Sequence, residues 1–150
     1  MAATLEITTH KGTRFSFSLK DELRQWVLGL APDCSIKFPP KTETEIDRTI
    51  SRKHCSITKT RGIPDYLKKK YQSREQEEKD IYILFDGIPG GTKKSSNGLY
   101  IKKRGEEKKR VEIALLEHGD IFYIGKQIIE FYRIFLNTEI KTDDKSTFSS

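Results

Sequence analysis

Alternation of apolar and polar side chains with a period of two is the pattern that most constrains this chain. Short stretches that show it are Leu5–Ile7, Phe15–Leu19, Ile36–Phe38, Leu99–Ile101, Val111–Ile113 and Ile129–Arg133. Successive side chains of a β-strand point to opposite faces, so this period is typical of strands with one buried and one wet face. Aromatic and β-branched residues fill the stretches, as half-buried strands prefer. The pattern predicts an all-β fold.

Turn residues separate these stretches at close intervals. They stand at Lys11-Gly12, Asn97-Gly98, Arg104–Glu106, His118–Asp120 and Gly125-Lys126. Many short strands joined by tight turns favour a sandwich or barrel over βαβ units. With 150 residues, one domain is expected. We assign residues 1–136 to that domain and residues 137–150, which contain few apolar side chains, to a disordered tail or linker.

One charged segment interrupts the rhythm of strands. Pro64–Asp80 is dense in Lys, Arg, Glu and Gln, which are good helix formers, and Pro64 suits a first helical turn. Its apolar stripe is thin and consists of Tyr66, Leu67 and Tyr71. We predict a charged insertion between two strands, either a short surface helix or a mobile loop. The basic clusters Lys102–Arg104 and Lys108–Arg110 flank a predicted hairpin and are interpreted as a solvated strand edge.

The sequence carries no pattern for a membrane span, a metal site or catalysis. No apolar stretch approaches the roughly 18 residues of a membrane span, and no signal peptide is evident, so a cytoplasmic protein without membrane contact is expected. Cys34 and Cys55 lack the spacing of metal ligands, so we expect free thiols and no metal or other cofactor. Gly87–Gly91 lacks the lysine and helix of a phosphate-binding P-loop. We expect a protein that is not an enzyme.

Two polar clusters at strand starts, Thr49–Ile57 and Lys93–Ile101, suit the binding of an anion. Each places a hydroxyl and a hydrogen-bonding side chain beside basic residues on a turn. Hydroxyl and amide groups donate to phosphate oxygens, while Arg or Lys supplies the opposite charge. The net charge of +6 also favours an anionic partner. The two clusters therefore predict an anion site on loops.

The motifs within and around these clusters resemble those of the forkhead-associated (FHA) family, in the same order and from about Ile7 to Phe135. The family has a first binding loop, an S-R-x-H motif, an S/T-N-G motif and an L-x-x-G-D-x-x-x-x-G stretch. The matching segments are Gly29-x-x-Pro32-x-Cys34-x-Ile36, Ser51-Arg52-x-His54, Ser96-Asn97-Gly98 and Leu116-x-x-Gly119-Asp120-x-x-x-Ile124-Gly125.

The resemblance implies an FHA-like β-sandwich of about eleven strands whose loops at one end hold phosphothreonine. It implies that the Ser51 hydroxyl bonds the phosphate and that Arg52 contacts the phosphate or the peptide next to it. Ser96 would face the phosphate as well, and Asn97 would bond the backbone of the bound peptide. His54 would brace the loops without touching the ligand.

By the same resemblance, Gly29 and Gly98 have structural roles. The chain would then be a phosphothreonine-dependent protein–protein interaction module in kinase-linked signalling. Its partner would be a phosphorylated protein. The sequence leaves the partner's identity and the oligomeric state open.

One position departs from the family. An arginine that usually follows the first-loop glycine is replaced by Leu30. Losing one charged hydrogen-bonding group costs about 1.5–3 kcal/mol, roughly ten- to a hundredfold in affinity. Candidate compensating cations are Lys37, Arg48, Lys93 and Lys94.

Two alternatives stay open. The Leu30 departure supports an FHA-like scaffold that docks another protein without phosphate. The basic charge and the tyrosines support a nucleic-acid-binding β domain, but stacking requires exposed rings and most tyrosines lie in the alternating stretches. No RRM, KH or zinc-finger signature appears, so nucleic-acid binding is disfavoured.

Overall fold

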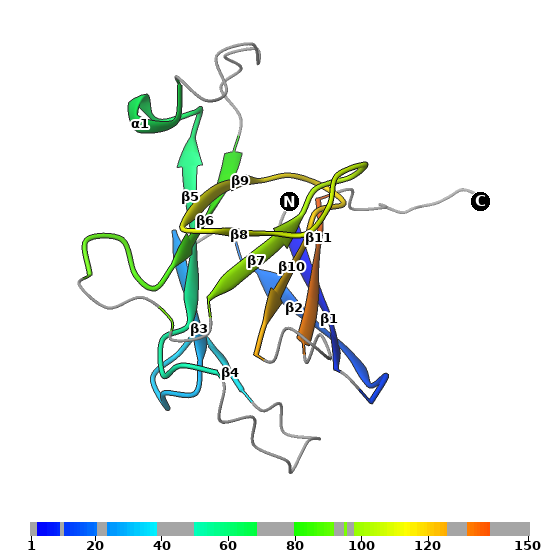
Figure 1. The fold of residues 1–150 in the computed structure, drawn as a ribbon. Helices are drawn as coiled ribbons and strands as arrows, with labels where there is room; N and C mark the ends of the chain where they lie inside the picture. Colours follow the sequence, from blue (N-terminus) through cyan, green and yellow to red (C-terminus); the bar gives the residue numbers. More distant parts are fainter. Residues whose placement is uncertain are drawn as a thin grey trace.

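The computed structural model describes residues 3–9, 11–20, 24–38, 50–68, 80–91, 95, 98–125 and 132–138. Its elements form two sheets that face each other (Figure 1). The strands are β1 (Ala3–Thr9), β2 (Arg14–Leu19), β3 (Gln25–Gly29), β4 (Ile36–Lys37), β5 (Cys55–Arg61), β6 (Asp80–Asp86), β7 (Leu99–Lys102), β8 (Lys109–Val111), β9 (Ile113–Leu116), β10 (Ile121–Ile124) and β11 (Tyr132–Asn137). One helical turn, α1 (Asp65–Lys68), follows β5. The prediction of an all-β sandwich of about eleven strands is confirmed.

The strand order explains how the alternating stretches pair. One sheet has six strands in the order β2-β1-β11-β10-β7-β8, and its pairs are antiparallel. The other has five strands in the order β4-β3-β5-β6-β9, in which only the β3–β4 pair is parallel. In β1, Ala3, Leu5 and Ile7 are buried and Glu6 is exposed, as a period of two requires.

The core lies between the inner faces of the two sheets. Its largest fully buried side chains include Trp26, Phe38, Phe122 and Tyr132. The rings of Phe38 and Tyr132 meet edge to face with their centroids 4.8 Å apart, which joins the end of β4 to the start of β11. Burying one such side chain stabilises the fold by roughly 1.5–3 kcal/mol. The contact between Phe38 and Tyr132 therefore helps to hold the two sheets together at the end of β4.

The stretch Val111–Ile113 was predicted as one strand, and that prediction is wrong. The chain leaves the six-stranded sheet after Val111, the last residue of β8, and enters the five-stranded sheet at Ile113, the first residue of β9. Glu112 lies at the crossing, where its carbonyl oxygen accepts a hydrogen bond from the Asp86 amide at 2.9 Å. The apolar-polar alternation continues through this crossing, so the sequence pattern does not reveal the change of sheet.

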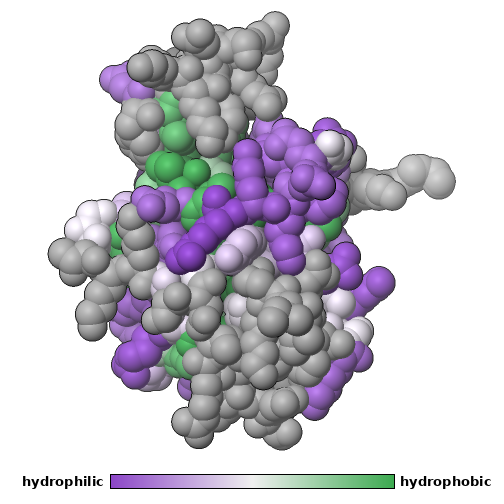
Figure 2. All heavy atoms as spheres, in the orientation of Figure 1, coloured by the Kyte–Doolittle hydropathy of each residue, from purple (hydrophilic) through white to green (hydrophobic). Residues whose placement is uncertain are grey.

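The predicted charged insertion begins as a short helix that packs on the sheet. Leu67 in α1 is buried with Ile63, Ile81, Ile83 and Leu115 in a small cluster on the five-stranded sheet, apart from the main core. Figure 2 shows apolar surface next to this segment. The rest of the insertion, residues 69–79, lies outside the described residues. The helical start of the insertion therefore covers a second apolar face of β6 and β9.

The basic residue Lys103 is not part of a solvated edge, contrary to the prediction. Its ammonium group pairs with the buried Asp120 and with Glu117, and it donates to the Leu115 carbonyl oxygen at 2.8 Å. The Asp120 carboxylate also accepts from the Glu117 amide at 2.8 Å. The Gly119-Asp120 motif thus fixes the turn before β10 by a charge pair that is shielded from water.

The predicted boundary at residue 136 falls inside β11, which ends at Asn137. Residues 139–150 lie outside the described residues, so the tail stays a prediction. Within the described part of the chain, no helix combines the length and apolar character needed to cross a bilayer.

Candidate functional site

Three of the predicted binding segments meet at one end of the sandwich because of strand pairing. The end of β3 lies beside the start of β5, where Leu28 pairs with Cys55. The start of β5 lies beside the end of β6, where Cys55 pairs with Asp86. The described residues 30–35, 50–54 and 87–91 extend from the sheet at these points (Figure 1). The order of strands, and not their proximity in sequence, brings the motifs together.

Gly29 allows the first two of these segments to touch through their backbones. A Cβ atom at Gly29 would lie 2.2 Å from the carbonyl oxygen of Arg52. The next two amides, of Leu30 and Ala31, donate to the carbonyl oxygens of Ser51 and Arg52 at 3.2 and 2.9 Å. Any side chain at Gly29 would force these backbones apart.

His54 joins the second segment to the third. Its side chain is fully buried. The Ser51 amide donates to its Nδ1 at 3.0 Å, and its Nε2 lies 2.8 Å from the Gly98 carbonyl oxygen. Because Nδ1 accepts, Nε2 carries the hydrogen and donates, so this geometry selects the neutral imidazole. The ring has the contacts of a brace between the two motif loops.

Backbone contacts of His54 tie the same point to both neighbouring strands. Its amide donates to the Leu28 carbonyl oxygen at 2.8 Å, and its carbonyl oxygen accepts from Gly87 at 2.9 Å. The Ser56 hydroxyl donates to the Gly87 carbonyl oxygen at 2.8 Å. The segment between β6 and β7 is therefore held where it leaves β6.

The far part of that segment is held by Asp86 and shaped by Gly98. The Asp86 carboxylate accepts from the Ser95 amide at 2.8 Å. Gly98 has a φ of +88°, and a Cβ atom there would lie 2.6 Å from Nε of Arg110. The left-handed backbone favours glycine at this position, and the flexible Arg110 side chain packs directly against it.

Arg110 is a residue of this end that the sequence did not single out. It lies on β8, exposed, and pairs across the strands with Tyr100. The sequence signal was only a basic cluster, and nothing in it distinguishes Arg110 from Lys108 and Lys109. The pairing of β7 with β8 is what brings it next to Gly98.

The structure describes only some of the residues that were predicted to hold phosphate. Ser51 is half-buried and Arg52 is exposed, at the start of the segment that His54 anchors. Lys37 is exposed on β4 and pairs with Gly29. The remaining predicted residues, Arg48, Lys93, Lys94, Ser96 and Asn97, lie outside the described residues, although Ser95 and Gly98 are placed on either side of Ser96 and Asn97.

Leu30, the position that departs from the family pattern, contributes to packing. Its side chain is half-buried and packs against the main core cluster. An apolar side chain here covers the core at the end of β3, which an arginine would not do as well. The replacement therefore has a structural use as well as a cost in charge.

Both cysteines are free thiols near this end. Burial raises the pKa of Cys55 well above its ordinary value, with a smaller contribution from the charge of Asp86. Burial also raises the pKa of Cys34, whose Sγ donates to the Arg52 carbonyl oxygen at 3.2 Å. Both side chains are therefore neutral at pH 7 and act in packing. Among the residues that the structure describes, no group of His, Cys, Asp and Glu is arranged to hold a metal ion.

Comparison with known proteins agrees with this architecture. The model of the FHA domain family matches residues 26–125. Among curated protein sequences, none matches significantly. The Slr1951 protein of Synechocystis sp. has a similar structure with a TM-score of 0.61 and 18% identity, covering 92% of this chain and 99% of that one.

Two further similar structures contain phosphorylated peptides. The FHA2 domain of Rad53, solved with a phosphotyrosyl peptide derived from Rad9, has a TM-score of 0.61 and 18% identity and covers 94% of this chain and 78% of that one. The yeast Dun1 FHA domain, solved with a doubly phosphorylated peptide derived from Rad53, has a TM-score of 0.55 and 16% identity, with coverage of 99% and 86%. At such identities the likeness establishes the fold.

Proposed function

Because this chain belongs to the FHA domain family, we propose that it is a phosphothreonine-dependent protein–protein interaction module and binds its partner without catalysis. The observation that carries the proposal is the bridge made by His54 between the Ser51 amide and the Gly98 carbonyl oxygen. It holds the two polar motif loops side by side at the end of the sandwich. The phosphopeptide complexes of the Dun1 and Rad53 domains support the binding of a phosphorylated partner.

Ser51, Arg52, Ser96 and Asn97 divide the binding between phosphate and peptide. A threonine phosphate carries close to two negative charges and presents three acceptor oxygens, so hydroxyl and guanidinium donors suit it without a metal. Ser51 and Ser96 donate to phosphate oxygens, and Arg52 supplies charge at its exposed position. Asn97 bonds the peptide backbone and keeps the peptide extended across the loops.

Nearby cations compensate for the arginine that Leu30 replaces. Lys37 is one candidate, because it is exposed on the strand paired with Gly29. Arg110 joins the candidates because its guanidinium lies against Gly98, directly beside the Ser96-Asn97 pair in sequence. Arg48, Lys93 and Lys94 remain candidates from their positions in the sequence.

Fluorescence polarisation with a degenerate phosphothreonine peptide library tests the proposal. Micromolar binding is expected for phosphothreonine, with much weaker binding of the phosphoserine and unphosphorylated libraries. Ser51→Ala should abolish binding, whereas Ser18→Ala should not, because Ser18 is an exposed serine on β2. Equal binding of phosphorylated and unphosphorylated libraries would contradict the proposal.

Docking without phosphate is the second candidate function, and the packing of Leu30 against the core favours it. A partner whose binding survives phosphatase treatment would support this function. Nucleic-acid binding stays disfavoured, because Tyr82, Tyr123 and Tyr132 are buried and present no stacking platform.

A further inference from the structure

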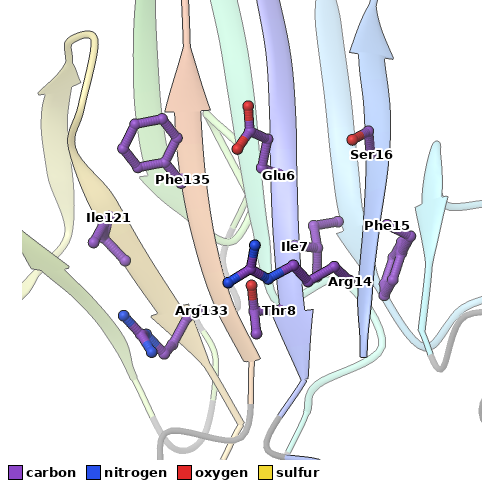
Figure 3. A pocket seen from close by; sticks show the side chains of 9 residues that line it. All are labelled: Glu6, Ile7, Thr8, Arg14, Phe15, Ser16, Ile121, Arg133 and Phe135. Atoms are coloured by element: carbon purple, nitrogen blue, oxygen red, sulfur yellow. The ribbon is translucent and has the colours of Figure 1, made fainter. Parts of the chain in front are cut away.

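The outer face of the six-stranded sheet contains a pocket that shares no residue with the loops around Ser51 and Gly98. Its volume is about 360 Å³, and residues of β1, β2, β10 and β11 line it (Figure 3). The polar side chains of its wall are Glu6, Thr8, Arg14, Ser16 and Arg133. Hydroxyl and guanidinium groups dominate this set, so the pocket offers chiefly hydrogen-bond donors with positive charge.

Strand pairing places Arg14 and Arg133 on either side of Thr8. Thr8 pairs with Arg14 on β2 and with Arg133 on β11. Paired residues point to the same face of a sheet, so the two arginine backbones are about 9.5 Å apart, twice the strand spacing. Figure 3 shows Arg14 reaching over β1 towards Thr8, while Arg133 points towards β10. Two flexible side chains with this placement can close on one group held above Thr8.

None of the residues that the structure describes neutralises the charge of Arg14 or Arg133 in an ion pair. Both arginines are exposed, and no carboxylate among the described residues forms an ion pair with either of them. Glu6, the carboxylate that lines the pocket, accepts a hydrogen bond from Asn137 Nδ2 at 3.0 Å. The guanidinium groups are therefore available to an anion from outside the chain.

A third arginine lies in the same transverse row of the sheet. Successive strand pairs place one row of residues across the sheet: Arg14, Thr8, Arg133, Tyr123, Tyr100 and Arg110. Exposed sheet faces commonly pair opposite charges across strands. This row contains three arginines and no carboxylate, so its net charge is positive.

The rest of the pocket is apolar and favours a polypeptide ligand. Ile121 and Phe135 line it and are half-buried. They offer contact area to the aliphatic part of a side chain or to a neighbouring apolar residue. A free inorganic anion would use the arginines but not this surface.

We propose that this pocket binds an acidic segment of another polypeptide, with one carboxylate held between Arg14 and Arg133 above Thr8. The Thr8 and Ser16 hydroxyls donate to the same group or to its backbone. A nucleic acid fits less well, because Tyr123, only 3% exposed, offers no surface on which a base could stack. The site is a second contact surface, separate from the loops proposed to hold phosphothreonine.

An NMR titration of the ¹⁵N-labelled chain with acetylated hexaglutamate tests this site. The amides of Thr8, Arg14 and Arg133 should shift together and saturate. The double variant Arg14→Gln/Arg133→Gln should weaken this binding at least tenfold, since it removes both charge-assisted contacts. Lys20→Gln/Arg61→Gln, which removes the same charge at exposed positions outside the pocket, should weaken it less than threefold.

Three further arms make the test decisive. Glu6→Gln should tighten hexaglutamate binding severalfold, because it removes the repelling charge and keeps an acceptor for Asn137. Ser51→Ala should leave these shifts unchanged, which separates this site from the proposed phosphothreonine site. Inorganic phosphate or hexathymidylate binding the same amides as tightly as hexaglutamate would overturn the proposal, as would equal losses in the two double variants.

Discussion

The Nε2 atom of His54 lies 2.8 Å from the carbonyl oxygen of Gly98, a residue 44 positions further along the chain. With Nδ1 accepting from the Ser51 amide, the ring satisfies both of its nitrogens inside the protein. One buried side chain thus links the segments that lead into β5 and β7, two strands of different sheets.

Replacing His54 by alanine should lower the free energy of unfolding by about 2–4 kcal/mol. The substitution leaves the Ser51 amide and the Gly98 carbonyl oxygen without their hydrogen-bond partner and creates a cavity. Urea denaturation measures this loss. His118→Ala is the control: His118 is half-exposed and should cost about 1 kcal/mol or less. An undisturbed unfolding curve for His54→Ala would contradict its role as a brace.

Replacing Gly29 by alanine should cost more than about 3 kcal/mol, because the new methyl group would overlap the backbone of Arg52. Gly105→Ala provides the comparison. Gly105 has a positive φ but nothing within 4 Å of a Cβ atom, so only backbone strain of about 1 kcal/mol is expected. Urea denaturation measures both losses. Equal decreases in the free energy of unfolding for the two variants would show that the close contact at Gly29 does not determine the cost.

Leu30→Arg should tighten phosphothreonine-peptide binding about tenfold by restoring one charge-assisted contact. It should also lower the free energy of unfolding by about 1 kcal/mol, because Leu30 packs against the core. Leu30→Gln removes the apolar cover without adding charge and should leave affinity unchanged. Calorimetric titration measures the affinity. If Leu30→Arg bound the peptide no more tightly than Leu30→Gln, position 30 would be excluded from the phosphate site.

Asn97→Ala should weaken the binding of a phosphothreonine peptide about tenfold, through loss of the hydrogen bonds proposed to the peptide backbone. The melting temperature should change little, because Asn97 is proposed to bond the bound peptide and not to support the fold. Fluorescence polarisation and a thermal melt measure the two effects. Unaltered affinity would exclude Asn97 from the site.

The buried thiol of Cys55 should make stability fall at alkaline pH. Burial raises the pKa of Cys55 in the folded state, so above about pH 9 the unfolded chain loses this proton first. The unfolded state then binds fewer protons, and the free energy of unfolding decreases as pH rises. Urea denaturation at about pH 8 and about pH 10 should show a smaller advantage of wild type over Cys55→Ala at the higher pH. A constant difference would contradict the shift.

The strands that sequence predicts well are those with one wet face. Leu5–Ile7 and Leu99–Ile101 alternate and lie within β1 and β7. The strand β6 shows no such alternation, because its residues from Ile81 to Leu84 are all buried. Its second face is covered by the cluster around Leu67, which no local pattern reveals.

The residues of the loop site could be predicted from the sequence, but their hydrogen-bond and packing partners could not. The motif at Ser51 and His54 marked the residues, whereas the partner of each His54 nitrogen depends on which strands pair. Arg110 and Lys103 looked alike as members of basic clusters. One packs on Gly98 and the other pairs with a buried carboxylate, and that difference arises only from tertiary contacts.

Calorimetric titration of one selected peptide, with and without its threonine phosphate, tests the central claim most directly. The account predicts micromolar binding of the phosphorylated peptide to the wild-type chain, with no measurable binding of the unphosphorylated form or to Ser51→Ala. Equal affinity for both peptide forms, or unchanged affinity in Ser51→Ala, would contradict it.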